Sequence, residues 1–196
     1  MESLRDRRFD AALRLVQKHH AGQVRAGGVP VWHHLARVSG ILETVLSDTG
    51  EGTSEGRADI VLAALGHDTL EDTEVREAEL EEVFGARALS LIKGMTNTFG
   101  DDHPEPYVAQ VAAAEEGTRL IKLADLLDNT MGATYNLYAL GVKWCDEFYL
   151  PIIRPMIPAM TTSEFSTYPA AAEKLKGMVT TVYDLFLEEL ERFRGV

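Results

Sequence analysis

Apolar residues recur every three to four positions along most of the chain, which is the spacing of one face of an α-helix. This period predicts amphipathic helices over residues 4–20, 31–47, 73–84, 107–116, 118–131 and 169–193. Two shorter segments, residues 58–67 and 86–95, are apolar almost throughout, and helices of that composition are usually buried. No two segments show the alternation expected of paired strands. The pattern therefore predicts an all-α bundle of about eight to ten helices, in one domain spanning residues 1–196.

Glycine- and proline-rich segments mark the boundaries between these helices. Loops are predicted over residues 21–30, 48–56 and 96–106. Gly85 is expected to end one helix, and Gly117 is expected to separate two others. Pro151, Pro155 and Pro158 interrupt the helical pattern, so a kink or a shortened helix is expected around them.

The charge of the chain narrows the range of partners. The formal net charge is −12, which argues against nonspecific nucleic-acid binding, because such binding depends on lysine and arginine neutralising phosphates. A small phosphorylated ligand remains compatible with this charge, since a metal ion and a few cations can reverse the potential of one cleft. The expected partner is therefore a small molecule, and the oligomeric state stays open.

The composition also bears on the compartment. Cys145 is the single cysteine, so no internal disulfide can form. No apolar stretch approaches the ~18 residues that a membrane span needs, and the charged N-terminal residues do not resemble a signal peptide. These features predict a cytoplasmic protein without a membrane partner.

Two histidines and two aspartates are the strongest candidates for chemistry. His67 and Asp68 are adjacent at the end of an apolar helical segment, with His34 upstream and Asp125 downstream. Imidazole nitrogens combined with carboxylate oxygens suit a divalent ion such as Mn²⁺ or Fe²⁺. Each residue alone is weak evidence, but Asp125 lies in the apolar run of residues 123–127, where a buried acid needs a cation or a partner.

Further polar residues lie one helical turn from these four. Glu71 and Asp72 each follow a member of the His-Asp pair by four residues, and Asn129 follows Asp125 by four. Positions i and i+4 share a helix face, so three helices can direct these groups toward one site in the core of a bundle. The segment at residues 101–103, Asp-Asp-His, could suggest a second metal site, but its proline-rich surroundings favour a solvated loop near the cleft.

These residues belong to three longer blocks. The blocks are H-x-x-Q-x-R…G-V-P…H at residues 20–34, H-D-T-L-E-D-T…F-G at residues 67–85, and K-L-A-D-x-x-x-N at residues 122–129. In this order they resemble the hydrolase domain of the RelA/SpoT family, within the HD superfamily of metal-dependent phosphohydrolases. The resemblance is greatest to the stand-alone small alarmone hydrolases of the metazoan SpoT-homologue type.

The resemblance implies an HD-domain fold, in which residues 20–130 carry the motifs and residues 131–196 close the bundle. It implies one Mn²⁺ ion, with Fe²⁺, Zn²⁺ or Mg²⁺ as alternatives, held by His34, His67, Asp68 and Asp125. The residues matching the pair that positions and activates the attacking water are Glu71 and Asp72. The residues matching substrate contacts are Arg25, Lys122 and Asn129. An alternative interpretation of Lys122 is a solvent-facing helix lysine.

The implied activity is Mn-dependent hydrolysis of (p)ppGpp at its 3′-diphosphate, which releases pyrophosphate and GDP or GTP. Two alternatives stay open: a hydrolase of a related nucleotide, either (p)ppApp or the 2′-phosphate of NADPH, and a catalytically idle nucleotide-binding module. The chain departs from the family pattern at Val31, where Tyr is usual, and at Asp128, where an aromatic residue or His is common. Thr130 and Met131 also replace the usual apolar residue and Arg. These changes touch the expected ligand pocket and not the metal set, so the substrate is less well defined than the metal.

Overall fold

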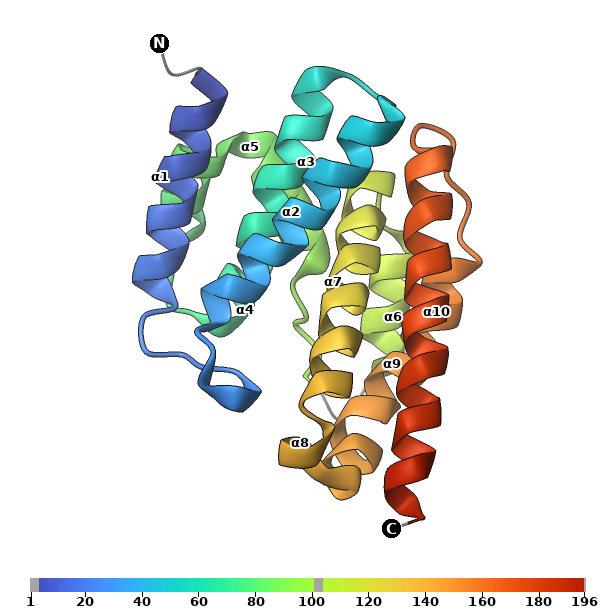
Figure 1. The fold of residues 1–196 in the computed structure, drawn as a ribbon. Coiled ribbons are helices and arrows are strands. Elements are labelled where there is room, and N and C mark those ends of the chain that lie inside the picture. The colour runs from blue at the N-terminus through green and yellow to red at the C-terminus, as the bar shows by residue number, and fades with distance from the viewer. Residues whose placement is uncertain (1–3, 101–103, 196) are drawn as a thin grey trace.

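Helices account for nearly all the secondary structure in residues 4–100 and 104–195, the part of the chain that the computed structural model describes (Figure 1). The helices are α1 (Leu4–His19), α2 (Val31–Thr49), α3 (Ser54–Gly66), α4 (Thr69–Asp72), α5 (Glu77–Met95), α6 (Pro104–Ala113), α7 (Glu116–Tyr135), α8 (Leu137–Trp144), α9 (Leu150–Thr161) and α10 (Pro169–Arg194). The only β pairing among the described residues is one isolated bridge between Val24 and Pro30. The predicted all-α fold is confirmed.

Helix α7 lies between two groups of helices. It packs along α10 on one side and against α2, α3 and α5 on the other (Figure 1). Nearly every residue between positions 117 and 128 of α7 is buried, and a helix that is surrounded in this way must be apolar on almost all its faces. Any polar side chain in this stretch therefore needs a partner inside the protein.

Two sequence predictions about helix ends are wrong. Helix α6 begins at Pro104, inside the segment predicted as a loop, because proline is well tolerated in the first turn of a helix. Gly117 does not separate two helices but lies in the first turn of α7, and the break falls at residues 114–115. A Cβ added at Gly117 would lie 2.9 Å from Leu91 Cδ2. The glycine therefore permits close packing of α7 against α5.

Gly85 changes the backbone direction inside its helix, whereas Pro155 and Pro158 lie within a continuous helix. Gly85 has φ 81° and ψ 159° inside α5, so it separates the two arms that correspond to the two predicted helices, as expected. Helix α9 runs to Thr161 with Pro155 and Pro158 inside it. The irregular turn precedes these prolines, as a π-helical segment at Cys145–Tyr149.

Two further expectations can be placed against the described residues. Among the described helices, none combines the length and apolar character that a membrane crossing requires. The acidic segment at residues 101–103, considered above as a second metal site or a solvated loop, lies outside the described residues.

Packing around the end of α3 generates a stability prediction. A Cβ at Gly66 would lie 2.7 Å from Phe84 Cε1 and 2.9 Å from Ile92 Cδ1. We therefore expect Gly66→Ala to lower the free energy of unfolding by about 1–3 kcal/mol, the usual range for overpacking. The matched control is Gly177→Ala in α10, where an added Cβ meets nothing within 4 Å. The control should stabilise the protein by about 0.5–1 kcal/mol. Denaturant unfolding of both variants measures the difference, and equal effects would contradict the packing.

Candidate metal centre

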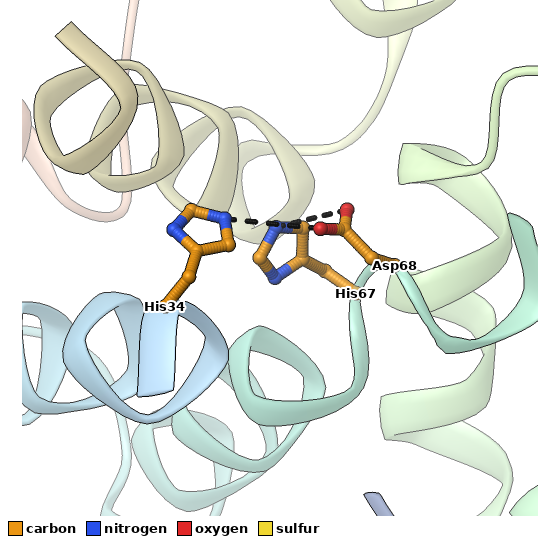
Figure 2. Close-up of side chains that lie close together, drawn as sticks. All are labelled: His34, His67 and Asp68. Carbon is orange, nitrogen blue, oxygen red and sulfur yellow. Dashed lines mark ion pairs between the residues drawn. The ribbon is translucent and has the colours of Figure 1, made fainter. Parts of the chain in front are cut away.

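Four polar side chains from three parts of the fold meet in the core of the bundle. His34 lies on α2, His67 and Asp68 follow the last turn of α3, and Asp125 lies in the middle of α7. His34 Nε2 is 3.2 Å from Asp125 Oδ1, and His67 Nε2 is 3.4 Å from the same oxygen. Figure 2 shows the two imidazoles directed toward Asp68, whose carboxylate oxygens lie 3.7 Å from His34 Nε2 and 3.1 Å from His67 Nε2. The structure thus brings together all four predicted ligands.

The two imidazole rings present lone pairs to this point. His67 Nδ1 lies 2.7 Å from the carbonyl oxygen of Ala64, and His34 Nδ1 lies 2.7 Å from Asp128 Oδ2. Both oxygens are acceptors, so each Nδ1 carries the proton and each neutral ring has its lone pair on Nε2. Both Nε2 atoms are buried and make no hydrogen bond within the described structure. Lone pairs that face carboxylate oxygens need a cation between them, and a divalent metal ion fits this requirement.

The spacing of the donor atoms also suits a metal ion. One donor atom from each of His34, His67 and Asp68 lies within 4.8 Å of the other two. Donors about 2.1 Å from an ion are about 3.0 Å apart in octahedral and about 3.4 Å apart in tetrahedral coordination. The observed contacts of 3.1 to 3.7 Å lie close to these values.

The electrostatics of the metal-free site favour positive charge at its centre. Burial disfavours the charged form of His67, but the charge of Asp68 and the close, charged carboxylate of Asp125 outweigh burial and raise the pKa of His67 to about 9. Burial likewise opposes ionisation of Asp125, yet Lys122 and the two histidines hold the pKa of Asp125 well below its ordinary value. A proton on His67 in the metal-free protein therefore takes the place of the positive charge that an ion would supply.

Asp125 is held from its own helix as well. Lys122 Nζ lies 3.0 Å from Asp125 Oδ2, and Asn129 Nδ2 donates to Asp125 Oδ1 at 2.6 Å. Lys122 is 8% exposed and also donates to Tyr107 Oη at 3.3 Å. The interpretation of Lys122 as a solvent-facing lysine is therefore wrong. Its ammonium group is a fixed cation at the wall of the site.

A cavity of about 330 Å³ opens beside the four predicted ligands. The polar residues that line it include Arg25, Asp68, Glu71, Asp72, Lys122, Asp125 and Asn129. Glu71 and Asp72 belong to the short helix α4 and are exposed to the cleft. Partial burial and the charges of Asp68 and Asp72 raise the pKa of Glu71 to about 7, although the backbone N–H of Asn97 donates to its carboxylate. A carboxylate with this pKa can take up a proton near neutral pH.

The remaining predicted site residues, Arg25 and Asn129, also line the cavity. Arg25 donates to Asn129 Oδ1, so the first and third sequence blocks meet there. Gln23 Nε2 donates to the carbonyl oxygen of Asp72 at 2.8 Å, and His20 Nδ1 lies 2.6 Å from Gln23 Oε1. These bonds connect the loop after α1 to the segment that carries the acidic pair. All nine predicted residues therefore border one site.

Among the residues that sequence reasoning missed are Asp128, which contacts the predicted ligand His34, and Arg37, which contacts Asp128. Asp128 accepts hydrogen bonds from His34 Nδ1 and from Arg37. Asp128 was noted only as a departure from the family pattern. The available signal was spacing, because Asp128 follows Asp125 by three residues and Arg37 follows His34 by three, so each pair shares a helix face.

With this geometry established, comparison with known proteins decides the family. Residues 12–129 match the family model described as HD domain. The chain belongs to the HD domain family. The match covers all four predicted metal ligands and confirms the resemblance drawn from the three sequence blocks.

Several curated relatives of this HD domain protein are named guanosine-3′,5′-bis(diphosphate) 3′-pyrophosphohydrolase. The one called MESH1 in Danio rerio is 37% identical over 105 residues, which are 52% of this chain and 54% of the relative. MESH1 of Drosophila melanogaster is 33% identical over 103 residues, covering 51% and 54%. The Aquifex aeolicus protein is 32% identical over 124 residues, covering 60% of this chain and 16% of that relative. The chain thus spans about half the length of the two animal relatives and less of the bacterial one.

Solved structures share the fold of this HD domain protein. A structure described as a metazoan ortholog of SpoT that hydrolyzes ppGpp superimposes with a TM-score of 0.72 and 22% identity, covering 94% of this chain and 97% of that one. The Listeria monocytogenes protein lmo0812 superimposes with a TM-score of 0.56 and 22% identity, covering 77% of this chain and 99% of the other. At these identities the likeness concerns the fold alone.

The geometry predicts that a divalent ion stabilises the folded protein. Mn²⁺ at about 100 times its Kd should add about 2.7 kcal/mol and raise Tm by roughly 5–10 °C. His34→Ala should abolish this shift, whereas His33→Ala, at the neighbouring position of α2 and outside the site, should keep it. Thermal unfolding with Mn²⁺ and with EDTA measures both variants. An equal Mn²⁺ shift in the His34 variant would contradict the assignment.

The charge of the metal-free site predicts a pH dependence. The pKa of His67 is raised from 6.5 to about 9 in the folded protein, so its stabilising contribution is present below pH 6.5 and is lost as the pH rises toward 9. The unfolding free energy in EDTA should fall across this window by on the order of 1–3 kcal/mol. With Mn²⁺ the trend should reverse, because metal binding requires neutral imidazole. Denaturant titrations across this window test both statements, and a metal-free stability that rises would contradict them.

Proposed function

We propose that this HD domain protein is a Mn²⁺-dependent 3′-pyrophosphohydrolase of (p)ppGpp, which releases pyrophosphate and GDP or GTP. The observation that carries the proposal is a single cavity lined by the proposed ligands Asp68 and Asp125, by the acidic pair Glu71 and Asp72, and by the cations Arg25 and Lys122. Curated relatives that carry this name support the substrate class. The acidic surface favours a small nucleotide over a nucleic acid as partner, and the proposal places the enzyme in the cytoplasm.

The proposed ligands of the ion are His34, His67, Asp68 and Asp125. A bound divalent ion lowers the pKa of water and polarises a phosphoryl oxygen. Their two carboxylates leave a cavity wall that is rich in negative charge, so the substrate phosphates need nearby cations. Arg25 and Lys122 supply these, Arg25 with the two-pronged geometry that suits phosphate.

In the proposed reaction, Glu71 of the acidic pair takes a proton from the attacking water. Water attacks the phosphorus bonded to the ribose 3′-oxygen, a new P–O bond forms, and the bond from phosphorus to the 3′-oxygen breaks. Glu71 accepts the proton of the attacking water, while the leaving 3′-oxygen takes a proton from solvent water in the open cleft. Burial, with the charges of Asp68 and Asp72, raises the pKa of Glu71 to about 7, so that this carboxylate can bind a proton near neutral pH. Asn129, beside Asp125, orients the substrate sugar or phosphate.

The first test is product analysis with purified protein, Mn²⁺ and ppGpp. We expect pyrophosphate and GDP in equal amounts from the wild type. Asp68→Ala should lose activity by more than about 100-fold, because even groups that contact a ligand from behind cost about 10–100-fold. Turnover of ppApp or NADPH, but not of ppGpp, would support the proposed hydrolase activity and show that the proposed substrate is wrong. Metal binding without any turnover would favour a nucleotide-binding module and contradict the proposal.

The role of Glu71 has a separate test. Glu71→Gln keeps the size of the side chain but cannot accept a proton. We expect kcat to fall by about 10²–10⁴ and the acid limb of the pH–rate profile to disappear. The Mn²⁺ dissociation constant should stay unchanged, because Glu71 is not among the proposed ligands. A variant with wild-type kcat and the same pH profile would exclude Glu71 as the base.

A further inference from the structure

A third carboxylate lies behind one of the proposed metal ligands. Asp128 Oδ2 is 2.7 Å from His34 Nδ1, while Nε2 of the same ring faces Asp125 and Asp68. The two nitrogens of His34 therefore have different partners: one faces the metal site and the other is bound to a carboxylate. Asp128 itself is not directed at the metal position through any contact among the described residues.

Arg37 makes this arrangement stable. Arg37 Nε donates to Asp128 Oδ1 at 2.7 Å, and its Nη2 donates to Oδ2 at 3.0 Å. Asp128 is 7% exposed, and a buried carboxylate is costly unless it is paired. Asp128 stays ionised, because hydrogen bonds from His34 and Arg37 lower the pKa of Asp128 to about 2 despite its burial. Arg37 also fixes the plane of the Asp128 carboxylate, because it binds both carboxylate oxygens.

The two imidazoles of the site are consequently held in different ways. His67 Nδ1 donates to a neutral carbonyl, that of Ala64, whereas His34 Nδ1 donates to an ionised carboxylate. A negative acceptor behind an imidazole fixes its tautomer and ring orientation and makes the opposite nitrogen a stronger donor to a metal. His34 and Arg37 lie three residues apart on α2, and Asp125 and Asp128 lie three residues apart on α7. The α2–α7 interface thus has two polar contacts in succession, His34 with Asp125 and Arg37 with Asp128.

We infer that Asp128, held in place by Arg37, is the positioning residue for His34 and sets the affinity of this site for its divalent ion. The inference rests on the metal-binding part of the proposed function and not on the identity of the nucleotide. Neither residue contacts the reacting atoms, so both act through His34.

The test measures Mn²⁺ binding to metal-free protein by titration calorimetry, without any substrate. Asp128→Ala should weaken Mn²⁺ binding by about 10–100-fold. Asp128→Asn should weaken it less, because the amide oxygen can still accept from His34 Nδ1 but carries no charge. Arg37→Gln should give an intermediate loss. The matched control is Glu115→Gln, which removes a carboxylate from a two-pronged pair with Arg87 away from the site and should leave Mn²⁺ affinity unchanged.

Two readouts separate this role from a general loss of structure. The metal-free variants should keep the far-UV circular dichroism of the wild type, and the kcat of Asp128→Asn on the substrate should recover at saturating Mn²⁺. Calorimetry decides the inference even if ppGpp is not the substrate. Folded Asp128→Ala and Asp128→Asn proteins with wild-type Mn²⁺ affinity would overturn it. If Asp128→Ala does not fold, the Asp128→Asn affinity alone decides.

Discussion

The Asp125 carboxylate is buried in the centre of the bundle, on a helix whose neighbouring positions are filled with leucine and alanine. A charge in such a place is unfavourable unless nearby groups compensate it. Lys122 and Asn129 bind its oxygens from α7, and the imidazoles of His34 and His67 face it from two other segments. The lone pairs of those imidazoles require a cation in turn. Much of the arrangement of polar groups in the core follows from this requirement.

The fold meets the requirement by dividing the tasks among helices. The buried helices α3 and α7 give a rigid frame, because their side chains pack on several sides. The groups proposed for chemistry, Glu71 and Asp72, lie on the four-residue helix α4 at the edge of the cleft. His34 and Asp125 lie within helices, which hold the geometry of a site better than loops do, whereas His67 and Asp68 lie in the two-residue turn between α3 and α4. The exposed acidic pair can exchange protons with solvent, whereas three of the four proposed metal ligands are buried.

Much of this architecture follows from the sequence. Helical periodicity predicts the bundle, and the anomalous acid at Asp125 together with the His-Asp pair predicts the metal position. Other features depend on contacts between distant segments. Glycine is typical of helix breaks, but Gly117 lies inside α7 and allows this helix to pack closely against Leu91. Lys122 becomes buried because Tyr107, from another helix, covers it. The Asp128–Arg37 pair could be predicted only by knowing which faces of α2 and α7 meet. The sequence shows only that each residue lies three positions after a predicted metal ligand.

The most direct test of the central claim is the position of a metal ion in a crystal of the protein grown with Mn²⁺. Anomalous scattering at the manganese edge locates the ion without reference to the protein atoms. We predict one peak about 2.0–2.3 Å from His34 Nε2 and His67 Nε2 and from oxygens of Asp68 and Asp125. A fully formed crystal with no peak there, or with a peak bound by other residues, would contradict the account.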